Sequence, residues 1–285
     1  MSKGQRIIVT GADSGYFELL SGLVRSIRDK PAGAEIGLGV LDVGLETQQR
    51  EWLEHQGASV TAPGWDVSFP EQDTLPRHRQ AQFARPFLPC HFPGHDAYMW
   101  IDADAWVQDW WAVDLFFRAA GEGRLAIVPE LDRAYRNFFH AWDEFHRVIR
   151  KSYSETFDSA TAEHLVRRPL LNSGAFALSA GAPHWKAWSD SLASALQRSR
   201  DALVDQTTLN HVIYLENLPA HFLPSWCNWI CHHAVPLRDD ARGCLVEPNL
   251  PHQKLGIVHL TMWMKNRRDL TYGFEGGDLA SAACS

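Results

Sequence analysis

The sequence predicts an α/β fold, with a mainly parallel central sheet and helices on both of its faces. Short apolar runs alternate with stretches of helical spacing along most of the 285 residues, and this alternation is typical of strands joined by crossover helices. The length suits one large domain, because α/β domains often exceed the common range of about 100–200 residues. An apolar content of 45% and a charged content of 21% are ordinary for a globular chain.

The strands are predicted where short apolar runs are bounded by polar or turn-forming residues. Six runs have this character: residues 6–10, 36–43, 97–103, 125–129, 174–178 and 256–260. In an open parallel sheet, ligands bind beyond the carboxyl ends of the strands. Polar residues directly after these runs are therefore the first candidates for a functional site.

The helices are predicted where apolar residues recur three and four positions apart. The first follows a cap at Asp13 or Ser14, and the second ends at Gly57. The four predicted helices cover residues 17–27, 46–56, 185–196 and 209–215. The polar, proline-bearing segment 63–78 is predicted to be a long loop, and residues 275–285 a frayed end.

The charge balance argues against nucleic acid as a partner. The chain has 27 basic and 34 acidic residues and a net charge of −7, whereas phosphate neutralisation needs a basic surface. No run approaches the roughly 20 apolar residues of a membrane span, although peripheral association with a membrane remains compatible with the sequence. An odd number of cysteines without an export signal indicates free thiols and a cytoplasmic protein. These cysteines are Cys90, Cys227, Cys231, Cys244 and Cys284.

The strongest chemical signal is a pair of carboxylates after an apolar strand. Asp102 and Asp104 follow the run ending at Ile101, and two carboxylates at a strand end can converge on a divalent cation. The alternative is an ordinary solvated strand end with two surface acids. His259 follows another apolar run, with Lys265 six residues later; a neutral imidazole can complete a metal site, although a single histidine is often structural.

Several segments, in their order along the chain, resemble the motifs of the family 8 glycosyltransferases, which are retaining GT-A enzymes that use nucleotide-sugar donors. The resemblance covers about residues 6–268. It rests on a first strand and turn, an Arg-containing element, the Asp-x-Asp, an Asn-x-Gly segment, an Asp-Gln helix start, an Asn-bearing segment and a terminal His…Lys. In this chain they are residues 7–16, 83–88, 100–104, 171–175, 205–210, 224–228 and 259–265. The chain departs from the pattern at Met262, where glycine is expected, and at Asn266-Arg267, where Pro-Trp is expected.

The resemblance implies a metal-dependent transfer of a sugar from a UDP-sugar to a hydroxyl acceptor, with retention of configuration. It implies a GT-A domain at residues 1–270, with an acceptor subregion at about 130–170 and a tail at 271–285. Mn²⁺ or Mg²⁺ would be held by Asp102, Asp104 and His259. The reacting sugar would face Asn172, Asp205 and Gln206. The donor would be bound by Thr10, Gly11, Asp13, Arg85, Ala103 and Lys265, and Glu130 and Asp132 are candidates for the acceptor hydroxyls.

Several of these residues could instead have purely structural roles. Asp13 and Asp205 could be helix caps, Asn172 a turn residue and Arg85 a surface arginine. For the chain as a whole, the main alternative is a catalytically degenerate sugar- or nucleotide-binding protein on the same fold.

Other classes of protein are also open. The Thr10–Gly15 turn imitates the start of a dinucleotide-binding oxidoreductase, but Phe17 stands where its last glycine belongs, and no tyrosine has a lysine four residues on. A nucleotidyltransferase would need a glycine-rich loop with Arg and Pro-Lys, which the sequence lacks. A zinc module is suggested by Cys227, Cys231, His232 and His233, although structural zinc sites usually have two spaced ligand pairs.

Overall fold

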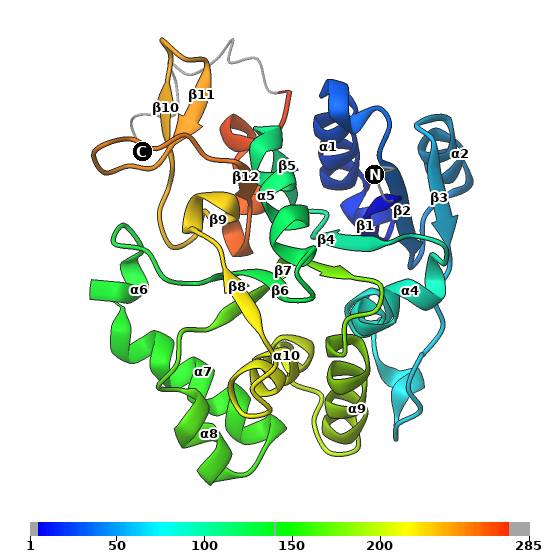
Figure 1. The fold of residues 1–285 in the computed structure, drawn as a ribbon, viewed down its shortest axis with the longest axis vertical. Helices are drawn as coiled ribbons and strands as arrows, with labels where there is room; N and C mark the ends of the chain where they lie inside the picture. The colour runs from blue at the N-terminus through cyan, green and yellow to red at the C-terminus, as the bar shows by residue number, and fades with distance from the viewer. Residues whose placement is uncertain (1–4, 140, 274–285) are drawn as a thin grey trace.

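A seven-stranded sheet forms the centre of the molecule, and the computed structural model describes residues 5–139 and 141–273. Its strand order is β3-β2-β1-β4-β7-β6-β8 (Figure 1). Every neighbouring pair is parallel except the two pairs that involve β7. The prediction of a mainly parallel sheet is thus confirmed. The strands are β1 (Arg6–Ala12), β2 (Gly37–Asp42), β3 (Ala58–Thr61), β4 (Ala97–Ile101), β6 (Leu125–Pro129), β7 (Leu171–Ser179) and β8 (Ala220–Phe222).

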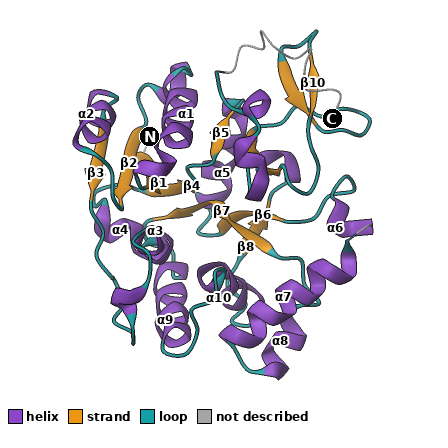
Figure 2. Cartoon of the chain, turned by 180° about the vertical axis from the view of Figure 1, so that it is seen from behind, coloured by secondary structure: helices purple, strands orange, loops and turns teal. Residues whose placement is uncertain are grey.

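Helices cover both faces of this sheet, as predicted (Figure 2). One face packs against α1 (Phe17–Arg28), α2 (Thr47–His55) and α5 (Trp110–Ala120). The other packs against α3 (His78–Phe83), α4 (Leu88–His91), α9 (His184–Leu196) and α10 (Val204–Tyr214). Strands buried on both faces are apolar throughout rather than alternating, which explains the continuous apolar runs of β1 and β4.

The first helix begins at Phe17, as predicted, but the predicted cap residue Asp13 serves a separate turn before it. Asp13 caps a short 3-10 turn at Ser14–Tyr16, where its Oδ1 accepts from the Tyr16 backbone N–H at 3.1 Å. The α-helix starts at Phe17 without a side-chain cap. The second helix starts with a capping box between Glu46 and Gln49.

Two predicted strands differ from expectation. The run 97–103 forms a strand only as far as Ile101, the end of β4; the Asp-x-Asp turn follows, and then the short β5 (Ala105–Val107), which was not predicted. The run 256–260 becomes β12 (Ile257–His259), which lies outside the central sheet. It pairs with β5 and with β9 (Trp229–Ile230) in a separate three-stranded sheet. A hairpin of β10 (Leu237–Asp239) and β11 (Cys244–Val246) completes the strands of the described chain.

Three further helices lie between β6 and β7, within the segment predicted to serve the acceptor. They are α6 (Arg136–Phe139), α7 (Trp142–Thr156) and α8 (Ser159–Leu165). The side chains of Ile149, Tyr153 and Leu165 form a small core of their own. Asp158 caps α8 by accepting from the Thr161 backbone N–H at 2.8 Å. The assignment of this segment to an acceptor remains a prediction.

The predicted loop has no strand and no α-helix up to α3, and a 3-10 turn at Gln72–Thr74 interrupts it. It is nevertheless anchored, because Trp65 and Phe69 pack against Phe83. The predicted frayed end, 275–285, lies outside the described residues, as does Cys284. The four cysteines of the described part have free thiols. Within that part, no helix has the length and apolar character that crossing a membrane requires.

Candidate active site

The two aspartates and the histidine converge at the turn between β4 and β5. The turn is fixed by backbone hydrogen bonds from Asp102 N–H to the Gly174 carbonyl (2.8 Å) and from Ala105 N–H to the Asp102 carbonyl (3.0 Å). His259 is the register partner of Ala105 in the β5–β12 pair. The pairing therefore brings His259 beside both carboxylates, and one ligand atom from each of the three residues lies within 4.8 Å of the other two.

Each carboxylate has one oxygen facing the histidine and one facing a basic side chain. His259 Nε2 lies 3.2 Å from Asp104 Oδ1 and 3.7 Å from Asp102 Oδ2. Lys265 Nζ lies 2.9 Å from Asp104 Oδ2, and Arg85 Nη2 pairs with Asp102 Oδ1. Two carboxylate oxygens and one imidazole nitrogen are thus left pointing at a common centre.

The other ring nitrogen of His259 is held by Asn228. His259 Nδ1 lies 3.1 Å from Asn228 Oδ1, and the Asn228 amide donates to Asn172 Oδ1 at 3.0 Å. Nδ1 is thereby directed to Asn228, which leaves Nε2 as the ring nitrogen available to a metal ion.

Gly174 keeps the space in front of this group open. A Cβ atom at Gly174 would lie 2.3 Å from His259 Cε1 and 2.7 Å from Asp102 Oδ2. A set of two carboxylates and one imidazole suits Mn²⁺ or Mg²⁺, and further oxygens from a diphosphate can complete the shell. The donor set and the free volume both fit such an ion.

Arg85 joins the metal-binding group to the start of α10. It is buried, and its Nη1 lies 2.5 Å from Asp205 Oδ2 and 2.9 Å from Ser173 Oγ. Asp205 lies in the first turn of α10 and not at its N-cap, which is Leu203. Arg85 is therefore a buried bridge between carboxylates, and neither the surface role of Arg85 nor the cap role of Asp205 holds.

Burial and charge act in opposite directions on these groups. Burial raises the pKa of Asp104, but His259 and Lys265 outweigh it and lower the pKa to about 2. Burial also raises the pKa of Asp102, and here it outweighs Arg85. Burial lowers the pKa of His259 while Asp104 raises it, and the carboxylates prevail. Charge pairing therefore prevails at Asp104 and His259, whereas burial prevails at Asp102.

Asn172 and Gln206 belong to a second buried network centred on Glu130. Asn172 Nδ2 donates to Glu130 Oε1 at 2.7 Å, and His233 Nε2 lies 3.1 Å from Glu130 Oε2. Gln206 Oε1 accepts from the Ser173 backbone N–H at 3.0 Å. Burial raises the pKa of Glu130, but the hydrogen bond from His233 and its charge lower it below the usual value. Asn172 lies within β7 and is not a turn residue.

A cavity of about 340 Å³ opens onto both networks. Eight of the predicted site residues line it: Arg85, Asp102, Asp104, Asn172, Asp205, Gln206, His259 and Lys265. Glu130 lines it too, whereas Asp132 accepts hydrogen bonds from Ala134 and Ser225 and is absent from its walls.

Four predicted donor-binding residues are not part of the cavity wall. Thr10 is buried, Gly11 fits closely between Ala81 and Leu41, and Ala103 is buried beside α1. Asp13 caps the turn that carries Tyr16, whose hydroxyl accepts from Lys265 Nζ at 3.0 Å. This turn is thereby connected to the site, and the donor-binding roles of the four residues remain predictions.

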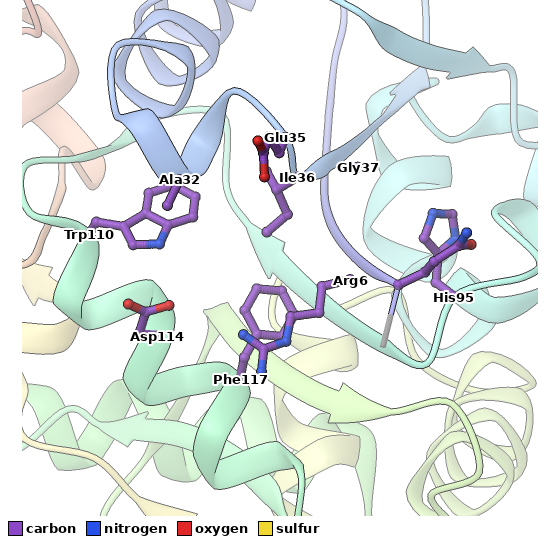
Figure 3. A pocket seen from close by; sticks show the side chains of 10 residues that line it. Arg6, Ala32, Glu35, Ile36, Gly37, His95, Trp110, Asp114 and Phe117 are labelled. Carbon is purple, nitrogen blue, oxygen red and sulfur yellow. The ribbon is translucent and has the colours of Figure 1, made fainter. Parts of the chain in front are cut away.

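A larger cavity, of about 480 Å³, lies at the other end of the strands from the Asp-x-Asp turn. Figure 3 shows Arg6, Glu35, His95, Trp110 and Asp114 around it. It is found at the amino ends of β1 and β2, where Arg6 and Gly37 begin their strands. Its lining does not include the converging carboxylates and imidazole, so it is not the candidate active site.

The four residues that suggested a zinc module do not form a metal-ligand cluster. Cys231 is buried with its thiol toward the Trp229 carbonyl, His232 bonds to Thr261, and His233 bonds to Glu130. Among the residues that the structure describes, Asp102, Asp104 and His259 form the one cluster with metal-ligand spacing.

Three contributors had no role in this site assigned from the sequence: Ser173, Asn228 and His233, the last of which was suggested only as a zinc ligand. Ser173 and Asn228 lie inside motifs that the resemblance identifies, so position within a motif was the available signal. His233 had no such signal, because its contact with Glu130 joins positions 103 residues apart.

Comparison with solved structures identifies the fold. No family model matches the chain, and no curated protein matches it. Solved structures do: the galactosyltransferase LgtC, in complex with donor and acceptor sugar analogues, is 18% identical, with 89% of this chain and 86% of that chain covered and a TM-score of 0.56. The apo form of the glycosyltransferase GlyE of Streptococcus pneumoniae TIGR4 is 17% identical, with 91% and 55% covered and a TM-score of 0.54. The bifunctional glycosyltransferase WbbM is 15% identical, with 79% and 40% covered and a TM-score of 0.52. The chain therefore has the GT-A fold that its motifs predict, and it resembles the family 8 glycosyltransferases as a divergent relative in fold.

Proposed function

We propose that this protein is a cytoplasmic, metal-dependent glycosyltransferase that moves a sugar from a UDP-sugar to a hydroxyl acceptor with retention of configuration. The observation that carries the proposal is the convergence of Asp102, Asp104 and His259 in a cavity that also holds Lys265 and Arg85. The similarity in fold to LgtC, which binds donor and acceptor sugar analogues, supports the same conclusion.

The donor end of the site is the cluster at the β4–β5 turn. Asp102, Asp104 and His259 would hold Mn²⁺ or Mg²⁺, which stabilises the negative charge that develops on a diphosphate leaving group. Lys265 lies beside Asp104 and supplies a second positive charge there. Thr10, Gly11 and Asp13 are proposed to contact the uridine and ribose.

The proposed transfer is a front-face one, as the resemblance implies, in which the leaving phosphate accepts the acceptor's proton. Four carboxylates line the cavity: Asp102, Asp104, Glu130 and Asp205. Each already has a basic or imidazole partner within hydrogen-bonding distance. These pairings hold the four carboxylates in place, and the proposal assigns none of them as a covalent nucleophile. Asn172 and Gln206 are proposed to position the sugar.

Removal of one metal ligand tests the proposal. Asp104→Ala should abolish Mn²⁺-dependent release of UDP from the donor, while Asp240→Ala, at a highly exposed carboxylate, should leave it unchanged. UDP release that is equal in both variants would refute the metal assignment. A thermal-shift panel of nucleotide sugars with Mn²⁺ would first identify the donor, because a ligand that binds the folded state raises its melting temperature.

Lys265→Ala tests the donor side separately. The loss of its charge should weaken donor binding much more than acceptor binding, measured as the change in KM for each substrate. A larger change in the KM of the acceptor than in that of the donor would refute the proposed contact between Lys265 and the diphosphate.

The second candidate function is a degenerate sugar-binding protein, and Met262 is the observation that favours it. Met262 replaces the expected glycine and lines the cavity. Binding of a UDP-sugar with Mn²⁺ but without turnover, over a panel of acceptors, would support this candidate over the enzyme.

A further inference from the structure

A second hollow adjoins the candidate active site on its α7 side. It has a volume of about 370 Å³ and shares Glu130, Phe145, Ile149 and Leu170 with the wall of the catalytic cavity. The two spaces therefore have a common boundary formed by these four side chains. A ligand that places a reacting group near Glu130 can extend directly into the second hollow.

The second hollow is lined mainly by apolar side chains. Besides the shared residues, its walls include Leu131, Phe138, Trp142 and Val166. Leu131, Phe138 and Trp142 are 47%, 52% and 48% exposed. Three large apolar side chains gathered half-exposed around one hollow indicate a surface that binds an apolar group.

The apolar lining continues across the mouth of the catalytic cavity. Val148 on α7 is 53% exposed and Met262 is 62% exposed, and both line that cavity. Met262 also has a φ of 56°, a left-handed conformation that favours glycine. A large apolar side chain thus occupies a backbone position that glycine would fill with less strain.

We propose that this hollow binds the apolar aglycone of the acceptor: the substrate is a glycoside or other hydroxyl compound that carries an alkyl chain, and the chain lies between α6 and α7. The inference rests on the proposed function and names its acceptor class. The hydroxyl end would lie near Glu130, at the boundary of the two cavities, and the chain would pack on Phe138 and Trp142. Bare hydrophilic saccharides would leave these surfaces in water.

Matched pairs of glycosides test the proposal without knowledge of the natural sugar. Methyl and octyl β-glucosides, and methyl and octyl β-galactosides, are titrated below the micelle concentration, and binding is followed by tryptophan fluorescence and calorimetry. The octyl member of each pair should bind at least about tenfold more tightly, because the methylenes that it adds leave water on binding. The double variant Phe138→Ser/Trp142→Ser should lose most of that ratio; both positions are half-exposed, so folding should survive.

The control is Leu237→Ser, at an apolar side chain of similar exposure on β10, which should keep the full ratio. Equal binding of methyl and octyl glycosides to the unmodified protein would overturn the proposal. An octyl preference that survives in the double variant would also overturn it, since the chain would then bind elsewhere. Co-sedimentation with phospholipid vesicles without any octyl preference would assign the apolar surface to a membrane instead.

Binding of UDP with Mn²⁺, measured on the same samples, separates this proposal from the proposed function. If no sample binds UDP, the proposed use of a UDP-sugar donor is refuted. The ratio of octyl-glycoside to methyl-glycoside affinity can still be measured. Intact UDP binding without an octyl preference would refute only the acceptor class.

Discussion

Gly174 shows how much one missing side chain matters to the site. Its place in β7 sets it directly against the ring of His259 and a carboxylate oxygen of Asp102. Both neighbours are themselves held by other contacts, to Asn228 and to Arg85. A methyl group there would have to displace a metal ligand or the strand.

Gly174→Ala is accordingly expected to remove Mn²⁺ binding and to lower the free energy of unfolding by about 1–3 kcal/mol, as over-packing does. Calorimetric titration with Mn²⁺ and urea denaturation measure the two effects. Gly181→Ala is the control, because a Cβ at Gly181 meets no atom within 4 Å. Normal Mn²⁺ binding in Gly174→Ala would contradict the proposed ligand arrangement.

Met262 is the clearest residue-scale departure from the family pattern. Its left-handed backbone is the conformation that the expected glycine would adopt freely. Met262→Gly should therefore raise the free energy of unfolding by about 1 kcal/mol through loss of backbone strain. Met262→Ala keeps the Cβ and should bring no such gain, which distinguishes strain from loss of an exposed apolar side chain. Thermal and urea unfolding compare the three proteins.

At the scale of elements, α9 holds the start of α10 in place. Trp188 on α9 is fully buried, and its Nε1 donates to the Asp205 carbonyl at 2.9 Å. The carboxylate of Asp205 in turn pairs with Arg85. The apolar spacing that predicted α9 thus also predicts part of the support beneath the site.

Trp188→Phe should lower the free energy of unfolding by about 2 kcal/mol, since it removes a buried hydrogen bond and leaves a small cavity. Trp142→Phe makes the same change at a half-exposed position on α7 and should shift it by less than 0.5 kcal/mol. Equal losses in the two variants, measured by urea denaturation, would show that burial of Trp188 does not matter to stability.

The sequence predicted elements best where the pattern was local. The runs of β1, β6 and the α9 region were placed within a few residues because their apolar spacing is uninterrupted. The helix α7 was not predicted, although Trp142, Phe145 and Ile149 have helical spacing. The helix α5 was not predicted either, although its buried residues Val113, Phe116 and Phe117 recur at helical spacing. The antiparallel direction of β7 and the separate sheet of β12 depend on partners far along the chain, which no local pattern encodes.

The same distinction applies to the site. Motif positions predicted Asp102, Asp104 and His259, and the structure brings them together. Their orientation depends on Asn228 and Gly174, and those contacts follow from strand pairing rather than from residue type. The residues of the donor turn, Thr10, Gly11 and Asp13, do not line the cavity, and their donor-binding role remains a prediction.

At the scale of the whole molecule, a buried histidine that does not line the candidate active site affects stability. Burial lowers the pKa of His184, whose Nε2 lies 2.9 Å from the Pro219 carbonyl. The unfolded chain has an ordinary histidine pKa of about 6.5 and so binds the proton first as pH falls. The folded state is therefore destabilised as pH decreases below about 6.5.

His184→Gln should remove this contribution. The free energy of unfolding of the unmodified protein should fall more steeply than that of the variant between pH 7 and pH 5, by about 1.4 kcal/mol for each unit by which the pKa is lowered. His78→Gln, at an exposed position, should keep the steeper dependence. Parallel curves for the unmodified protein and His184→Gln would contradict the assignment.

The pairing of Lys265 with Tyr16 and of His259 with Asp104 has a consequence for folding. These contacts join positions 249 and 155 residues apart. Contacts at such separations close large loops, and they form late because the entropy of closure must be overcome first. The metal-binding group is therefore completed only when the last strand has docked. During refolding, Mn²⁺ binding should therefore return only when the native state has formed, and not in a folding intermediate.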